Sequence, residues 1–212
     1  MHAEYSAARM DPRHDVCEHA RKMWEQGLVT GAAGNVSRRV DGERIAITPS
    51  GMPYESMQPG DVVIVPGGEG KPSYELPMHL AIYRARPDVH AIVHTHSPFV
   101  TALSVLRRPL PPVIDEMAVY FGGTIGVADY AFTGTPALGD NAVRALGDSP
   151  AVMLASHGNV CVAGSLARAL ALAIAMEAGA RIYLQALQIG EPAPLPDDAL
   201  AAGRRLFEER RS

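Results

Sequence analysis

The sequence predicts a single α/β domain, because segments of helical periodicity alternate with short β-like runs along its 212 residues. Hydrophobic residues make up 47% of the chain, which is enough for one core at this length. No repeat, low-complexity tract or polar linker divides it. We therefore expect one domain over residues 1–212, with several antiparallel, hairpin-like pieces.

In the first half, Asp11-Pro12 is typical of a helix start, and apolar residues recur at helical spacing as far as Gly27. The Gly/Ala-rich segment 31–34 predicts a turn that leads into Asn35. The runs 44–48 and 61–65 are β-like, with a turn-rich loop between them. Residues 76–86 predict a helix that Pro87-Asp88 ends.

In the second half, the segment 90–96 alternates and predicts a strand, and the apolar run 151–155 predicts a buried one. A shorter β-like run covers 159–163. Ser165 caps a long helix that reaches about residue 189. Further helices are expected over 98–106, 137–146 and the tail 194–212, whose basic residues gather at the C-terminal end as the helix dipole favours.

The composition excludes several classes of protein. Two cysteines, Cys17 and Cys161, cannot form a disulfide scaffold and fit a reducing compartment. A net charge of −4 without a basic block argues against a nucleic-acid partner. The N-terminus has no apolar stretch of the secretory kind. The apolar run Leu166–Met176, broken by Arg168, looks too short for a membrane span, so we expect a cytoplasmic protein.

Three histidines lie at or beside the ends of predicted strands. His94 and His96 are two positions apart, so on a strand both imidazoles face one side, and His157 follows an apolar strand. Three neutral imidazoles with an open fourth position are typical of a catalytic zinc site. The H-x-H pair alone is equally compatible with solvated or hydrogen-bonded histidines.

Glu75 lies where a loop meets a helix, and His79 follows it at a spacing of four, on the same helix face. A carboxylate beside a metal-bound substrate is the usual general acid or base, whereas an acid at a helix start is also common without any such role. We interpret His79 as a histidine that is packed in the core or that supports a neighbouring site residue. The small-residue loops 31–37 and 48–51 offer backbone N–H groups to an anion, but neither matches a nucleotide-binding spacing.

Five motifs occur in a fixed order: GAAGNVS (31–37), ITPSGMPYE (47–55), the S-x-E-x-P-x-H of 73–79, ARPDVHAIVHTHS (85–97) and SHG (156–158). Together they resemble the class II aldolase/adducin family, and within it the L-fuculose-phosphate aldolase group. The resemblance spans about residues 16–190. It implies a three-layer α/β/α fold with a central, largely antiparallel sheet, and a homotetramer with active sites between neighbouring subunits.

The resemblance also implies roles for single residues. His94, His96 and His157 correspond to the zinc ligands, and Glu75 to the catalytic acid/base that can also approach the metal. The phosphate of the substrate would be held by Asn35, Ser50, Gly51 and Ser73. The implied reaction is the reversible cleavage of a ketose 1-phosphate, such as fuculose 1-phosphate or a 5-deoxypentulose 1-phosphate, into dihydroxyacetone phosphate and an aldehyde.

The chain departs from the family pattern at three places. Tyr74 replaces a second serine before Glu75, and Ala32 stands where a threonine is frequent, so the phosphate site loses hydroxyl donors. In the segment where the relatives place a tyrosine acid, the nearest match is Glu116, four positions before Tyr120. Glu116 is a candidate acid for the aldehyde oxygen, or simply a surface acid beside Asp115.

Two other functions remain open from the sequence. A zinc-dependent decarboxylase of a 3-oxo or hydroxy-aromatic acid would use the same metal residues, and the weakened phosphate site favours it. A non-catalytic interaction module of the adducin kind would lack the zinc histidines, whereas this chain retains all three.

Overall fold

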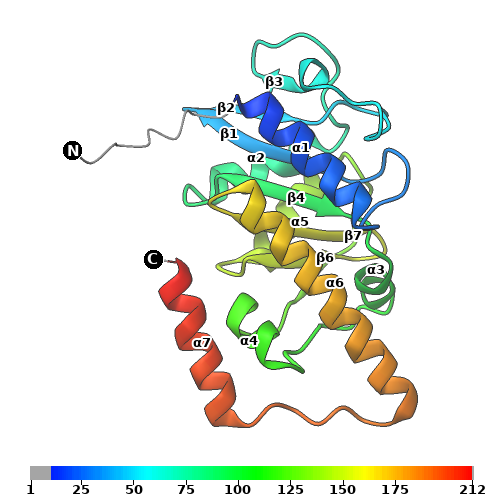
Figure 1. Cartoon of the computed structure of the whole chain (residues 1–212), viewed down its shortest axis with the longest axis vertical. Helices are drawn as coiled ribbons and strands as arrows, with labels where there is room; N and C mark the ends of the chain where they lie inside the picture. Colours follow the sequence, from blue (N-terminus) through cyan, green and yellow to red (C-terminus); the bar gives the residue numbers. More distant parts are fainter. Residues whose placement is uncertain (1–10, 212) are drawn as a thin grey trace, which may run out of the picture.

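Seven strands form one mixed sheet in the computed structural model, which describes residues 11–211 (Figure 1). The spatial order is β3-β2-β1-β4-β7-β6-β5, and each neighbouring pair is antiparallel except β5 and β6. This confirms the largely antiparallel sheet. The strands are β1 (Asn35–Asp41), β2 (Arg44–Ile47), β3 (Val63–Val65), β4 (Ala91–Thr95), β5 (Val127–Ala128), β6 (Ala151–Leu154) and β7 (Gly158–Ala163).

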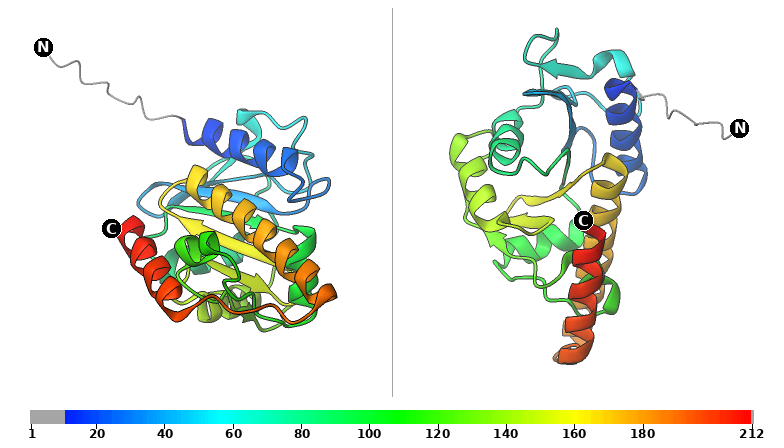
Figure 2. Two further views of the ribbon diagram at one scale, coloured as in Figure 1. Left: turned by 60° about the horizontal axis from the view of Figure 1, so that its bottom comes forward. Right: turned by 90° about the vertical axis from the view of Figure 1, so that its left-hand side faces the viewer.

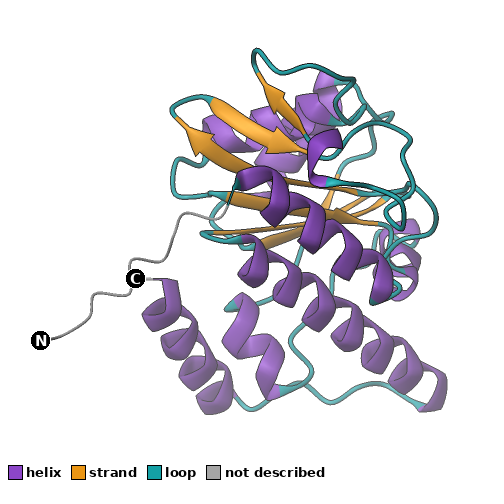
Figure 3. Cartoon of the chain, turned by 45° about the horizontal axis from the view of Figure 1, so that its top comes forward, coloured by secondary structure: helices purple, strands orange, loops and turns teal. Residues whose placement is uncertain are grey.

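Helices cover both faces of the sheet, so the three expected layers are present (Figures 2 and 3). On one face lie α1 (Pro12–Glu25) and α6 (Leu166–Ile189), and on the other lie α2 (Leu76–Ala85) and α5 (Pro136–Leu146). The helix α7 (Asp197–Arg211) packs on α4 (Asp115–Phe121). A short helix, α3 (Pro98–Val105), follows β4, and a single 3-10 turn covers Pro59–Asp61.

The strand β4 has a different environment on each face. Ala91 and Val93 belong to the core under α1 and α6, whereas Ile92 belongs to the core under α2 and α5. Because side chains alternate along a strand, His94 shares the face of Ile92 and points toward α2. It is completely buried there.

The structure adds elements that the sequence did not reveal. β1 begins directly after the predicted turn 31–34, and its polar residues 37–39 conceal the alternation of a strand. α4 and β5 have seven and two residues, too few to give a periodic signal. The run expected over 61–65 is a strand only over Val63–Val65, since Pro59–Asp61 forms the 3-10 turn.

The helix α6 corrects the estimate of its apolar length. It continues through Glu177 and Arg181 to 24 residues and contains an 18-residue stretch with a mean hydropathy of 1.3, so by length and composition alone it could cross a membrane. Its inward side chains pack on β4 and β7, which is how a core helix of a globular protein is used. Residues 1–10, on which the expected absence of a secretory signal largely rests, lie outside the described part of the chain.

The N-terminus of α3 is capped from another helix. Ser97 occupies the N-cap position, but its side chain makes no capping hydrogen bond. Instead the carboxylate of Glu177, on α6, accepts hydrogen bonds from the backbone N–H groups of Phe99 and Val100, both at 3.0 Å. A negative charge at this end of a helix also complements the helix dipole.

Gly34 allows the loop before β1 to lie directly on β4. Its φ of +71° is in the left-handed region, and an added Cβ would lie 2.6 Å from the carbonyl oxygen of His94 and 2.7 Å from the side chain of Val29. A side chain at this position would therefore push the loop away from the strand that carries His94.

We predict that Gly34→Ala lowers the free energy of unfolding by more than Gly31→Ala does. Gly31 lies in the same loop with a φ of +62° and open space around its Cβ position, so alanine there meets only the left-handed backbone cost of about 1–2 kcal/mol. Urea unfolding of both variants measures the difference. Equal losses would show that the approach to His94 carries no energetic weight.

Candidate metal centre

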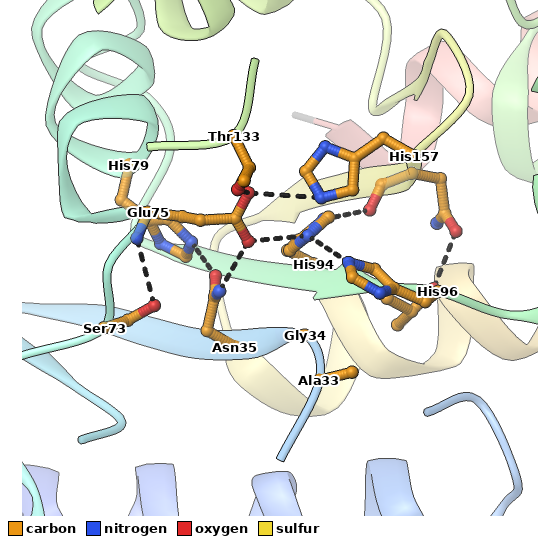
Figure 4. Close-up of polar contacts among 12 residues, drawn as sticks. Ala33, Gly34, Asn35, Ser73, Glu75, His79, His94, His96, Thr133 and His157 are labelled. Atoms are coloured by element: carbon orange, nitrogen blue, oxygen red, sulfur yellow. Dashed lines mark hydrogen bonds and ion pairs between the residues drawn. The ribbon is translucent and has the colours of Figure 1, made fainter. Parts of the chain in front are cut away.

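Four side chains from distant parts of the chain meet at one end of the sheet (Figure 4). His94 lies in β4 and His96 directly after it, His157 lies in the turn between β6 and β7, and Glu75 precedes α2. Their ligand atoms all lie within 4.8 Å of one another. The structure thus brings together the three predicted metal ligands and the predicted acid/base.

The sheet positions His157 beside the H-x-H pair. β7 pairs with β4 so that Asn159 lies opposite Thr95, which sets the preceding turn next to His96. Gly158 permits this approach, because a Cβ there would lie 2.1 Å from the carbonyl oxygen of Thr95. Ser156 adopts a φ of +54°, which turns the chain sharply before His157.

A backbone contact fixes which nitrogen of His94 can bind a cation. Its Nδ1 lies 2.9 Å from the carbonyl oxygen of Asn159, which can only accept, so Nδ1 donates. The Nε2 of neutral His94 then carries a lone pair, and it lies 3.0 Å from Nε2 of His96 and 2.9 Å from Oε2 of Glu75. Metal-binding histidines are commonly oriented in this way, by a hydrogen bond from the other ring nitrogen to a backbone carbonyl.

The electrostatics of the cluster favour neutral imidazoles at two of the three positions. Burial, reinforced by the charge of His94, lowers the pKa of His96 to about 3 and that of His157 to about 4. For His94, burial opposes protonation, but the adjacent Glu75 carboxylate outweighs it and raises the pKa. Burial likewise acts to raise the pKa of Glu75, yet His94 outweighs it and holds that pKa well below its usual range.

These residues fit a divalent metal ion. Imidazole nitrogens bind zinc at about 2.0–2.1 Å, so tetrahedral ligands lie ~3.3 Å apart. The contacts His94–His96, His94–Glu75 and His157–Glu75, at 3.0, 2.9 and 3.2 Å, are close to that spacing. The Nε2 atoms of His94 and His96 lie 3.0 Å apart, and a cation bound by both would stabilise two lone pairs at this separation. The donors are three nitrogens and one carboxylate with no thiolate, a set suited to a catalytic rather than a structural ion.

The carboxylate of Glu75 is held on all sides. Oε2 accepts a hydrogen bond from Nδ2 of Asn35 at 2.9 Å, and Oε1 accepts one from the hydroxyl of Thr133 at 2.8 Å. Oε1 also lies 3.2 Å from Nε2 of His157. Only 6% of Glu75 is exposed, and it lines the pocket, so a substrate reaches its carboxylate through that pocket.

A pocket of about 390 Å³ opens above Glu75, His96 and His157. The residues predicted to bind phosphate all line it, and they are Asn35, Ser50, Gly51 and Ser73. Its mouth carries three exposed aromatic rings, Tyr74, Tyr130 and Phe132. Sequence reasoning missed Tyr130, Phe132 and Thr133, because they belong to an irregular loop with no motif of its own.

Glu116, the candidate for the second acid, and the nearby Tyr120 both lie elsewhere in the chain. Glu116 is exposed in the first turn of α4 and is not among the described residues that line the pocket. The ring of Tyr120 faces the guanidinium groups of Arg168 and Arg210, at 5.0 and 5.9 Å. A single chain therefore does not bring either group to Glu75.

We predict that His94→Ala abolishes stoichiometric metal binding, while His90→Ala does not. Loss of a direct ligand should weaken binding beyond the roughly 10–100-fold caused by loss of an outer partner. His90 is an exposed histidine just before the same strand, so it is a matched control. Metal content after dialysis, measured by elemental analysis, is the readout. Full metal content in His94→Ala would refute this ligand assignment.

We predict that His79 makes the free energy of unfolding fall more steeply with decreasing pH than it does in a variant without this histidine. Burial, with a smaller contribution from His94, lowers the pKa of His79 from 6.5 to about 3. Between those two pH values the unfolded chain binds one more proton than the folded chain, so the free energy of unfolding falls as pH falls. The slope of this fall approaches about 1.4 kcal/mol per pH unit. Urea unfolding from about pH 7 to about pH 5 should show a shallower fall in His79→Gln. Parallel curves for the two proteins would contradict this.

Known proteins share both the sequence and the fold. Residues 14–184 match the "Class II Aldolase and Adducin N-terminal domain". A 5-deoxy-D-ribulose 1-phosphate aldolase of Bacillus thuringiensis serovar kurstaki is 39% identical over 204 residues, which cover 92% of this chain and 95% of that protein. An L-fuculose phosphate aldolase of Escherichia coli O6:H1 is 39% identical over 193 residues, covering 88% of this chain and 89% of that protein.

A solved structure gives the same result. An L-fuculose 1-phosphate aldolase superposes with a TM-score of 0.89 at 35% sequence identity, and the match covers 95% of this chain and 98% of that one. Sequence, fold and the convergence of Glu75 with three histidines agree with one another. The chain belongs to the class II aldolase and adducin family.

Proposed function

We propose that this protein is a zinc-dependent aldolase that reversibly cleaves a ketose 1-phosphate into dihydroxyacetone phosphate and an aldehyde. The observation that supports the proposal is the buried, ionised carboxylate of Glu75, which lies beside three histidines and lines the pocket. Relatives at 39% identity bear the names of aldolases that act on 5-deoxyribulose 1-phosphate and fuculose phosphate.

The phosphate would lie against the two loops at the pocket wall. Ser50 and Ser73 offer hydroxyl groups, and Gly51 lets the backbone approach an anion closely. Asn35 spends one amide N–H on Glu75, so its second N–H is the one left for the phosphate. Because Ala32 and Tyr74 provide no hydroxyl at the two positions where relatives often have one, this site has fewer donors.

The aromatic mouth of the pocket favours an apolar aldehyde part. Tyr74, Tyr130 and Phe132 expose rings beside the metal ligands and provide no charge for a second phosphate. Fuculose 1-phosphate and 5-deoxypentulose 1-phosphates both end in a methyl group. Either substrate would place that methyl group toward this mouth.

The chemistry divides between the metal and the side chains. When bound by His94, His96 and His157, zinc supplies positive charge for the oxygens that become negative in the reaction. In the direction of synthesis, Glu75 takes the proton from the carbon of dihydroxyacetone phosphate that forms the new bond. That carbon attacks the aldehyde carbon, and the aldehyde oxygen takes up a proton to become a hydroxyl group.

The proton for the aldehyde oxygen requires a second acid. Glu116 is our candidate, and it would act from a neighbouring copy, because in its own chain it lies on α4 outside the pocket. We accordingly propose a homotetramer with shared active sites, acting in the cytoplasm, with neither nucleic acid nor membrane as a partner.

A panel of ketose 1-phosphates tests the proposal. We expect the zinc-loaded protein to release dihydroxyacetone phosphate, and a chelated sample to release none. A protein that holds zinc but releases only carbon dioxide from 3-oxo or hydroxy-aromatic acids would be the decarboxylase. A protein that purifies without metal and ignores chelators would be an interaction module.

We predict that Glu75→Gln retains its metal but loses turnover. The three histidines remain, while the proton acceptor is gone, which typically costs about 10²–10⁴-fold in kcat. Glu69→Gln, at an exposed loop position, is the control and should leave kcat unchanged. Steady-state kinetics with 5-deoxyribulose 1-phosphate, alongside metal analysis, provides the readout. Full activity in Glu75→Gln would remove Glu75 from the mechanism.

A further inference from the structure

A single row of polar side chains runs from Glu75 into the interior between α2 and β1. Glu75, His79 and Tyr83 recur every four residues on one side of α2, and Asn35 and Ser37 alternate with them from one face of β1. All five residues are buried, and Asn35 and His79 are part of the cluster in Figure 4. We call these five residues the Glu75–Tyr83 row.

The hydrogen bonds of the row have one possible direction. The ionised Glu75 can only accept, so the amide nitrogen of Asn35 faces it, and Oδ1 of Asn35 faces Nε2 of His79 at 2.5 Å. Nε2 must then carry the proton of the imidazole. Nδ1 is left as an acceptor, and it takes the hydroxyl proton of Ser37 at 2.6 Å.

The last contact completes the same direction. Since Ser37 has given its only proton to His79, the hydroxyl of Tyr83 donates to Ser37 at 2.9 Å. His79 is neutral, because burial lowers its pKa to about 3, and a neutral imidazole has the one N–H that this pattern needs. Each donor in the row therefore points toward Glu75.

We propose that His79 is a positioning residue, which holds the Asn35 amide in the one orientation that presents its NH₂ group to Glu75. This inference rests on the proposed function, in which Glu75 moves the proton. Without a donor at Nε2 of His79, the buried Oδ1 of Asn35 loses its partner, and only the contact with Glu75 still orients the amide. The amide can then shift away from Oε2, and Glu75 loses part of the support that holds it between Thr133 and the histidines.

Two substitutions at His79 separate positioning from packing. In His79→Gln the amide nitrogen reaches the place of Nε2 and can donate to Asn35, whereas His79→Phe keeps a ring but no donor. We expect His79→Phe to lower kcat about 10–100-fold, as loss of an orienting contact commonly does, and to lower it more than it raises KM. His79→Gln should recover kcat to within about 3-fold of the parent. Both should retain metal.

A double variant tests whether His79→Phe lowers kcat through its effect on Glu75. In a Glu75→Gln background, His79→Phe should cause no further loss of kcat, because the group that it positions is already inactive. Tyr83→Phe removes the donor at the far end of the row but leaves His79 in contact with Asn35, so it should lower kcat less than His79→Phe does. His90→Phe, at an exposed position outside the row, is the control and should leave kcat unchanged. Equal losses in His79→Gln and His79→Phe, or a full further loss in the double variant, would overturn the proposal.

Nitrogen-15 NMR of the histidine rings tests the direction of the row without any variant or substrate. We expect His79 to carry its proton on Nε2, and a proton on Nδ1 would overturn the proposal. The NMR measurement needs no turnover, so it still tests the hydrogen-bond direction if no ketose 1-phosphate is cleaved. A wrong aldolase assignment can therefore be distinguished from a wrong direction of the hydrogen bonds. His79→Asn, whose amide cannot reach Asn35, replaces His79→Phe if that variant does not fold.

Discussion

The site depends on the register in which β1 pairs with β4. Asn35 lies directly opposite His94, and Ser37 opposite Ile92, so all four side chains face α2. A slip of one residue would turn Asn35 and Ser37 toward α1 and α6, away from Glu75 and His79. The apolar neighbours hold the register, since Val36 and Val93 pair in the core on the other face. Burial of valine side chains thus fixes the polar geometry of the site.

Much of this site could be predicted from the sequence, because several of its contacts are local. The alternation along a strand placed His94 on the face that it occupies, and the spacing of four on a helix placed His79 beneath Glu75. The role of His96 was less direct: it follows the last residue of β4, so the turn after the strand aims it at the cluster. The approach of His157 depends on the pairing of β7 with β4, which no local pattern contains.

The features that escaped prediction depend on packing between segments far apart in the sequence. Thr133 donates a hydrogen bond to Glu75 from an irregular loop that has neither helical nor strand periodicity. β1 is polar along its middle, because Arg38 pairs with Asp15 of α1 on one face while Arg39 lies over the ring of Tyr83, on α2, on the other. Its strand character therefore comes from pairing with its two neighbours. Glu116 lies on a helix of seven residues, and one chain alone gives it no place in the pocket.

The cap that Glu177 provides for α3 releases Ser97 for another task. Serine at a helix start normally satisfies the first N–H groups with its own hydroxyl. Here the hydroxyl of Ser97, with that of Thr95, donates to the side chain of Asn159, whose backbone carbonyl orients His94. Glu177 on α6 therefore has two effects: it caps α3, and it leaves the hydroxyl of Ser97 free to support Asn159, which orients the candidate metal ligand His94.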